Sequence, residues 1–113
     1  MKKQTIHIPR GAKIGPENKP IYGYEEVQAY CKGGLAIHKA VGKGERWKWS
    51  VTHINTGMKI DIIGANTKRD AETNMNKALA LDFDWTMSEA DTMAALKANR
   101  WVTDAIRKIG ERA

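Results

Sequence analysis

Two adjacent cations give the clearest indication of a binding site in this sequence. Lys68 and Arg69 follow Thr67, which can cap a helix, so both cations would stand in a first helical turn. A helix N-terminus presents unpaired N–H groups and a partial positive charge, and two further cations there suit an anion such as a phosphate. Solvation of an exposed turn explains the same residues, and the sequence leaves both explanations open.

A second basic stretch joins a glycine-rich loop to two tryptophans. The loop holds Lys43 and Arg46, and we expect it to be exposed and available to a polyanion. Trp47 and Trp49 would share one face of a strand, where they could stack on unpaired bases with Lys48 and Arg46 alongside. The same tryptophans suit the anchor of a protein interface or, as the favoured interpretation, a core beneath helices.

Residues typical of catalysis or metal binding are few and scattered. His7, His38 and His53 lie far apart, and none has a Cys, His or acidic neighbour at a metal-ligand spacing. We expect His53 to be a hydrogen-bonded strand residue and Cys31 to pack in the core. The sequence therefore predicts no enzyme, no metal and no cofactor.

Composition limits the class of protein. The 113 residues carry 42% hydrophobic side chains and a net charge of +6, which fits one soluble domain. The positive charge suits a partner that carries phosphates, and it equally suits solubility alone. The charge is uneven, because residues 1–46 hold nine Lys or Arg against four Asp or Glu. The single cysteine, the lack of an apolar span and the lack of a signal sequence favour a cytoplasmic protein without a membrane partner.

The elements that must position these residues begin with a hairpin and a helix. Alternation over 47–52 and 58–62 around a turn at 55–57 predicts two paired strands. After Gly64 the apolar period becomes helical, and the spacing predicts a helix from Thr67 to about Leu81.

The flanking segments complete the predicted order of elements. Residues 1–20 hold all three prolines and predict an extended or flexible basic arm, with a short edge strand at 5–8. Residues 21–113 would form a single α+β domain. Its first helix would cover 24–32, because Tyr24, Val27, Tyr30 and Cys31 fall on one helical face, and residues 35–41 would be a strand.

A long C-terminal helix closes the predicted domain. Thr86-Met87-Ser88-Glu89 has the spacing of a capping box, and the helix would cover residues 87–109. Its inward stripe would consist of Ala90, Ala94, Ala98, Trp101, Val102, Ala105, Ile106 and Ile109.

The order resembles the double-stranded RNA-binding domain over residues 22–81. That family has an α-β-β-β-α plan with a three-stranded antiparallel sheet packed on helices, and this chain would add a C-terminal helix. The stretch 27–35 looks like the family's first helix and its exit. The stretch 67–72, Thr-Lys-Arg-Asp-Ala-Glu, resembles the start of its last helix, although Glu72 replaces a basic residue and the 42–46 loop lacks the family's pattern.

The resemblance implies a function and a set of contacts. Lys68 and Arg69 would face phosphates across a major groove, while the loop with Lys43 and Arg46 would enter a minor groove and the first helix, through Gln28, would enter another. We therefore expect a non-enzymatic nucleic-acid-binding module, with duplex RNA favoured.

An alternative of a different class fits the same chain. It is a small accessory or inhibitor protein of a phage or mobile element, for example an anti-defence protein, which would bind a host protein or nucleoprotein complex through its last helix or its exposed aromatics. The sequence leaves the oligomeric state open.

Overall fold

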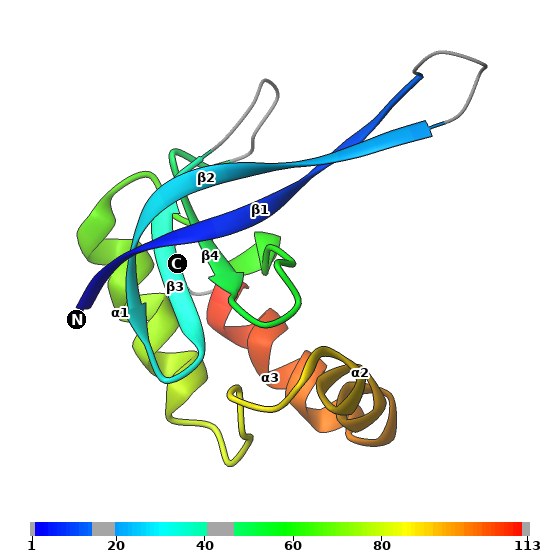
Figure 1. Ribbon diagram of the computed structural model, residues 1–113. Helices are drawn as coiled ribbons and strands as arrows, with labels where there is room; N and C mark the ends of the chain where they lie inside the picture. Colours follow the sequence, from blue (N-terminus) through cyan, green and yellow to red (C-terminus); the bar gives the residue numbers. More distant parts are fainter. Residues whose placement is uncertain (1, 15–19, 41–46, 112–113) are drawn as a thin grey trace.

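Four antiparallel strands and three α-helices follow one another in the described part of the chain (Figure 1). The computed structural model describes residues 2–14, 20–40 and 47–111. The elements are β1 (Lys2–Ile14), β2 (Pro20–Lys32), β3 (Leu35–Lys39), β4 (Trp49–His53), the short 3-10 helix η2 (Asp61–Ile63), α1 (Lys68–Leu79), α2 (Glu89–Ala98) and α3 (Arg100–Glu111). The strands form one sheet in the order β1-β2-β3-β4. The predicted α+β class is confirmed, whereas the sheet has four strands rather than three.

The segment predicted as the first helix is strand β2, so the α-β-β-β-α order is wrong for this chain. In β2 the small apolar residues Val27, Ala29 and Cys31 alternate with Glu26, Gln28, Tyr30 and Lys32. The same residues satisfy a helical spacing of three and four, which is why the pattern was ambiguous. Pairing with β1 on one side and β3 on the other selects the strand.

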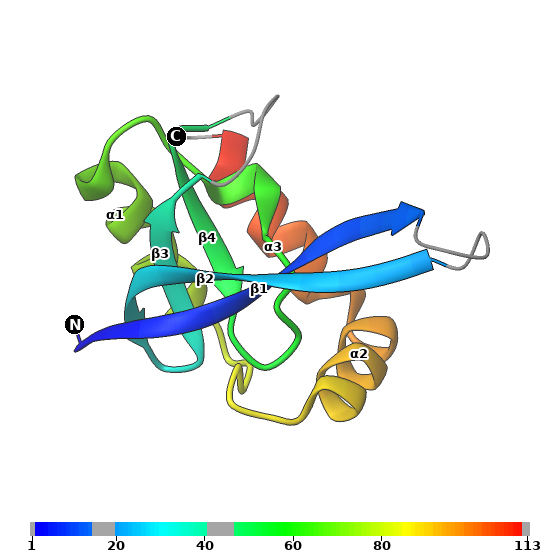
Figure 2. The same ribbon diagram turned by 45° about the horizontal axis from the view of Figure 1, so that its top comes forward.

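The N-terminal segment predicted as an arm is, over Lys2–Ile14, the edge strand β1. It pairs with β2 from Lys2 opposite Cys31 to Ile14 opposite Pro20, with an irregularity in register between Arg10 and Lys13. Proline and glycine are tolerated here because an edge strand has one unpaired side and a bulge accommodates a glycine. The paired strands form a long ribbon that extends past the rest of the molecule (Figure 2).

Strands β2 and β3 are joined by a two-residue turn at Gly33 and Gly34. Both glycines have positive φ, 58° and 92°, as a tight hairpin turn of this length requires. A Cβ on Gly34 would lie 2.3 Å from the carbonyl oxygen of Trp85, so this position also lets the connector between α1 and α2 approach the sheet.

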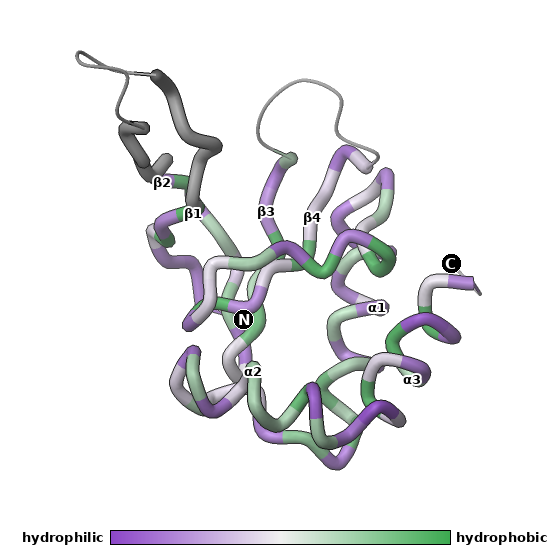
Figure 3. Tube along the Cα trace, turned by 90° about the vertical axis from the view of Figure 1, so that its right-hand side faces the viewer, coloured by the Kyte–Doolittle hydropathy of each residue, from purple (hydrophilic) through white to green (hydrophobic). Residues whose placement is uncertain are grey.

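Strands β3 and β4 lie between the ribbon and helices α1 and α3 (Figure 3). On the helix side, Leu35, Ile37 and Val51 are fully buried against the larger core, to which α1 and α3 contribute. The other helix-side members of this core are Ile63, Ala65, Ala71, Met75, Ala78, Trp85, Val102, Ile106 and Ile109. A smaller apolar cluster of Ile6, Ala29, Cys31 and Ala36 lies on the ribbon side. Both faces of β3 are therefore buried.

The second strand of the predicted 47–62 hairpin is only partly formed. The Met58 carbonyl accepts the His53 N–H at 2.9 Å, and the Ile60 N–H donates to the Val51 carbonyl at 2.7 Å; the chain then turns into η2. The turn lets Ile63 enter the core while Ala65 pairs again with β4, at Trp49.

The predicted C-terminal helix is two helices, because Asn99 interrupts it. The Asn99 amide donates to the Ala95 carbonyl at 2.9 Å and closes α2, and α3 begins at the next residue. Ser88, rather than Thr86, caps α2 through a hydrogen bond from the Asp91 N–H. The break resets the helical phase, so Trp101 is 46% exposed instead of inward-facing. In the described residues we find no helix that is both long and apolar enough to cross a membrane.

Candidate nucleic-acid interface

The start of α1 lies at the end of the sheet where β3 finishes and β4 begins. Lys39, the last residue of β3, is paired with Trp49 of β4. Trp49 pairs in turn with Ala65, which leads through the Thr67 cap into α1. We call this end of the molecule the α1 end. Strand pairing thus links Lys39, through Trp49 and Ala65, to the segment that leads into a helix far away in the sequence.

Lys68 and Arg69 occupy the first turn of α1, as predicted. The Thr67 hydroxyl accepts a hydrogen bond from the Asp70 N–H at 3.1 Å, which fixes where the helix begins. Consecutive helical residues point about 100° apart. Lys68 is half-buried against β2 whereas Arg69 is exposed, so the two cations do not form a single pair of phosphate ligands.

The ammonium group of Lys68 lies over an aromatic ring. Its Nζ atom is 3.5 Å from the centre of the Tyr30 ring on β2, a cation–π contact. One turn further along α1 from Glu72, Asn76 accepts a 3.3 Å hydrogen bond from the Lys32 ammonium group. Helix α1 is therefore linked to β2 at two places, by Lys68 with Tyr30 and by Asn76 with Lys32. Glu72 lies between these two contacts along the helix.

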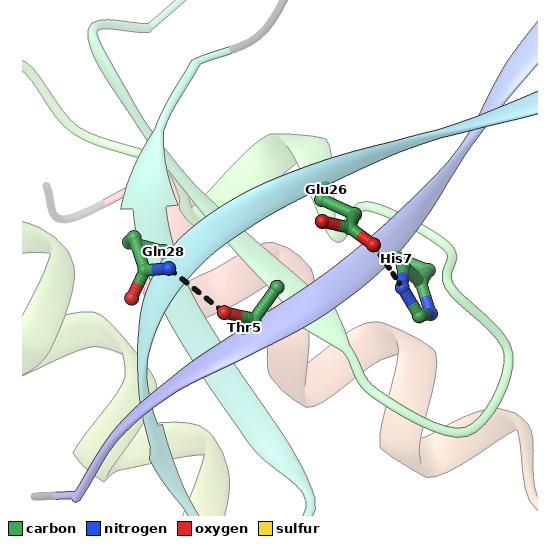
Figure 4. Close-up of polar contacts among 4 residues, drawn as sticks. All are labelled: Thr5, His7, Glu26 and Gln28. Carbon is green, nitrogen blue, oxygen red and sulfur yellow. Dashed lines mark hydrogen bonds and ion pairs between the residues drawn. The ribbon is translucent and has the colours of Figure 1, made fainter.

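A polar face of the ribbon continues from Tyr30. Strand alternation places Gln28 and Tyr30 on the same side of β2. Gln28 donates a 2.7 Å hydrogen bond to the Thr5 hydroxyl, and the His7 ring lies 3.2 Å from the Glu26 carboxylate (Figure 4). All four of these side chains are exposed. Gln28 thus belongs to an exposed strand face and cannot enter a groove as part of a helix.

The other predicted contact residues divide into two groups. Lys48 is exposed beside β4, and its carbonyl accepts the Ala40 N–H at 2.9 Å, which places it at the α1 end. Lys43 and Arg46 lie outside the described residues. At the α1 end the described cations are therefore Lys39, Lys48, Lys68 and Arg69. Asp70 and Glu72 follow Lys68 and Arg69 directly in α1 and bring two carboxylates to the same helix.

The two tryptophans have different environments. Trp49 is half-buried and packs against the larger core. Trp47 is also half-buried, and its indole N–H donates to the Asp61 carbonyl at 2.8 Å. Beside it is a depression of about 350 Å³ whose other walls include Asn66, Asp70 and Lys77. The two tryptophans therefore do not form an exposed platform on which bases could stack.

The histidines and the cysteine have structural contacts. His53 is buried in β4, where its Nε2 atom is 2.8 Å from the Trp85 carbonyl and its Nδ1 atom is 2.8 Å from the Thr56 hydroxyl. The expectation of a hydrogen-bonded strand histidine is confirmed. Cys31 is buried, and loss of solvation raises the pKa of its thiol, as expected for a core cysteine. Among the residues that the structure describes, His, Cys, Asp and Glu form no group of three that could hold a metal ion.

Sequence reasoning missed two members of the α1 end. The helical pattern puts Tyr30 on an apolar helix face, and Lys39 has no role in the predicted strand. The strand alternation of Gln28, Tyr30 and Lys32 is the signal for Tyr30. Lys39 carries no local signal, because its link to the α1 end depends on the pairing of Trp49 with both β3 and Ala65.

Comparison with known proteins gives no relative of this chain, since no protein-family model, curated protein or solved structure matches it.

Proposed function

We propose that the protein is a non-enzymatic nucleic-acid-binding module that contacts phosphates through its α1 end. The observation that carries the proposal is that Lys68 and Arg69 stand in the first turn of α1, while Lys39 and Lys48 lie where β3 ends and β4 begins, and β4 is joined through the Trp49–Ala65 pair to the segment that leads into α1. Cations clustered on one face provide the attraction on which sequence-independent binding depends. Asp70 and Glu72 reduce the local positive charge, so we expect few phosphates to be bound at a time.

The ribbon supplies the second part of the proposed surface. Its edge strand β1 contains four Lys or Arg and no Asp or Glu. Its exposed Thr5 and Gln28 side chains are groups that can contact phosphate or sugar oxygens. An edge strand also uses charge to avoid pairing with other chains, and that role is compatible with binding.

Duplex RNA is the favoured form because of the sequence resemblance at residues 67–72. A duplex would be read by its shape and by its 2′-hydroxyls rather than by its sequence. The mode of binding would differ from the family's, since the residues around Gln28 form a strand and not a helix.

A titration with three nucleic acids tests the proposal. Tryptophan fluorescence would follow binding of duplex RNA, duplex DNA and a single strand at two salt concentrations. We expect salt-sensitive binding that is strongest for duplex RNA. Lys68→Ala with Arg69→Ala should weaken it and lower the salt slope by about two.

The matched control removes two exposed cations elsewhere. Lys97→Ala with Arg100→Ala takes the same charge from α2 and α3. It should leave the salt slope nearly unchanged. Equal effects of the two double variants, or no binding to any of the three nucleic acids at low salt, would exclude the α1 end as the binding surface.

A further inference from the structure

The ribbon of β1 and β2 presents one exposed polar face. It consists of two cross-strand pairs, Thr5 with Gln28 and His7 with Glu26, which strand alternation puts on the same side (Figure 4). We call these four side chains the polar face. The other side of the same strands carries Ile6 and Ala29, which are buried in the smaller apolar cluster. The polar face is therefore the side of this part of the ribbon that a ligand can reach.

One contact within each pair orients the side chains and leaves further hydrogen-bonding groups available. The Gln28 amide donates to the Thr5 hydroxyl at 2.7 Å, and the His7 ring lies 3.2 Å from the Glu26 carboxylate. The Gln28 amide keeps a second N–H and its carbonyl oxygen, and the Thr5 hydroxyl keeps its own hydrogen. To the described residues, neither of these two side chains makes another hydrogen bond. Donors and acceptors thus remain side by side.

These remaining groups suit a hydroxyl better than a phosphate. A phosphate oxygen accepts hydrogen bonds and carries negative charge, so the Glu26 carboxylate and the Gln28 carbonyl oxygen would repel it. A sugar hydroxyl both donates and accepts, and the 2′-hydroxyl is the group by which a protein can tell RNA from DNA. The polar face therefore has the chemistry of a hydroxyl site, in contrast to the cations of the α1 end.

The polar face adjoins two of the chain's cations. Tyr30 follows Gln28 on the same side of β2, and the Lys68 ammonium nitrogen lies 3.5 Å from the centre of its ring. Exposed Lys3 of β1 lies opposite Tyr30. Successive side chains on one side of a strand are about 7 Å apart, so cations follow directly after the hydrogen-bonding pairs. An RNA duplex offers the matching order, because its wide, shallow minor groove displays 2′-hydroxyls and is bordered by phosphates.

We propose that the polar face contacts 2′-hydroxyls in the minor groove of an RNA duplex and so distinguishes RNA from DNA. The inference rests on the proposed function and adds to it the residues that determine selectivity. Lys3 and Lys68 would meet phosphates at the border of the groove, while Thr5 and Gln28 meet hydroxyls within it. A DNA duplex would keep the phosphate contacts alone.

Two RNA duplexes of one sequence test the proposal. One is unmodified, and the other carries fluorine in place of every 2′-hydroxyl, which keeps the A-form shape and removes the donor hydrogen. Tryptophan fluorescence of the full chain would measure both affinities at two salt concentrations. We expect the unmodified duplex to bind about tenfold more tightly, the effect of about two neutral hydrogen bonds. The salt slopes should be equal, because both duplexes carry the same phosphates.

A double variant of the polar face should abolish this preference. Thr5→Val with Gln28→Met removes the hydrogen-bonding groups and nearly preserves side-chain size at exposed strand positions. We expect it to bind the two duplexes equally with an unchanged salt slope. Lys68→Ala with Arg69→Ala should do the reverse, lowering the salt slope and keeping the preference.

The matched control makes the same exchange away from the polar face. Gln4→Met with Thr103→Val changes an exposed amide on the other side of β1 and an exposed hydroxyl on α3, and it should alter neither quantity. Glu26→Gln is a second variant of the polar face, and it should leave the salt slope nearly unchanged, because hydroxyls carry no charge. A salt slope larger by about one in this variant would place a phosphate against the polar face and overturn the proposal.

The outcomes separate this inference from the proposed function. Equal affinity of the wild type for the two RNA duplexes would overturn the inference and leave nucleic-acid binding intact. A preference that survives in Thr5→Val with Gln28→Met would also overturn it. No binding to any nucleic acid would contradict the proposed function and this inference together.

Discussion

The Lys68 ammonium nitrogen lies 3.5 Å from the centre of the Tyr30 ring and joins α1 to β2. Tyr30 also packs against the larger core, so its side chain contacts both the protein interior and the Lys68 cation. The contact fixes a cation of the α1 end at the place where the ribbon leaves the sheet. Lys68 is therefore a structural residue as well as a candidate phosphate ligand.

This contact predicts a measurable coupling between the two residues. In a double-mutant cycle of Lys68→Met and Tyr30→Leu, we expect a coupling of about 0.5–1 kcal/mol in the free energy of unfolding, the usual size of an exposed cation–π contact. Urea denaturation of the four proteins measures it. In the control cycle, exposed Arg69→Met with Tyr30→Leu should be additive within about 0.3 kcal/mol. Additivity in the first cycle would show that the ring and the ammonium group do not interact.

Gly34→Ala should be strongly destabilising. The new Cβ would lie 2.3 Å from the Trp85 carbonyl oxygen, and the φ of 92° is unfavourable for alanine. Together these effects should cost at least about 2 kcal/mol of unfolding free energy. Thermal or urea denaturation measures the loss.

Gly33→Ala is the matched control for the turn. It also has positive φ, 58°, but its Cβ would meet only the end of the Leu79 side chain, at 2.8 Å, and that side chain can rotate away. We expect a smaller loss, of about 1 kcal/mol. If both variants lose equal stability, backbone strain alone limits this turn and the close approach of Trp85 is unimportant.

His53→Leu should destabilise the protein by about 2 kcal/mol. Because a carbonyl can only accept, the His53 Nε2 atom donates to the Trp85 oxygen. The substitution would leave that buried carbonyl without a donor. His53→Gln should recover part of the loss, since its amide nitrogen can donate from a position close to Nε2. Equal losses in the two variants, measured by urea denaturation, would argue against the hydrogen bond.

Burial of the Cys31 thiol predicts that the free energy of unfolding decreases at alkaline pH. In the unfolded chain its thiol ionises near the ordinary pKa of 9.0, and burial raises the pKa of the folded thiol. The unfolded state therefore loses this proton first. The thiol's contribution to stability is complete below about pH 9 and is lost as the pH rises through the folded pKa.

The comparison that isolates this effect is between wild type and Cys31→Ala. Urea midpoints at pH 8 and pH 10 would be measured for both proteins, so that the titration of lysines and tyrosines cancels. We expect the wild type to lose more stability than the variant over this interval. An equal loss would contradict the assignment to Cys31.

Features that depend on neighbours along the chain could be predicted from the amino-acid sequence. The Thr67 cap and the apolar period after it predicted the start of α1, and with it the place of Lys68 and Arg69, because capping and helical periodicity are local interactions. The α+β class followed from the same kind of signal. That Lys68 and Arg69 bind nucleic acid stays a prediction.

The remaining features could not be predicted, because they depend on contacts between residues that are distant in the sequence. Residues 24–32 suited a helix or a strand until β1 and β3 paired with them. The contact of Tyr30 with Lys68 and the place of Lys39 at the α1 end both depend on strand pairings that no local pattern specifies. The depression lined by Ile60, Trp85, Leu96 and Ile106 likewise requires residues from four separate segments, two of which are separate helices because Asn99 ends α2. Burial of apolar surface depends on the whole folded chain. It favours one of two local conformations, such as helix or strand over residues 24–32, that have similar free energies in isolation.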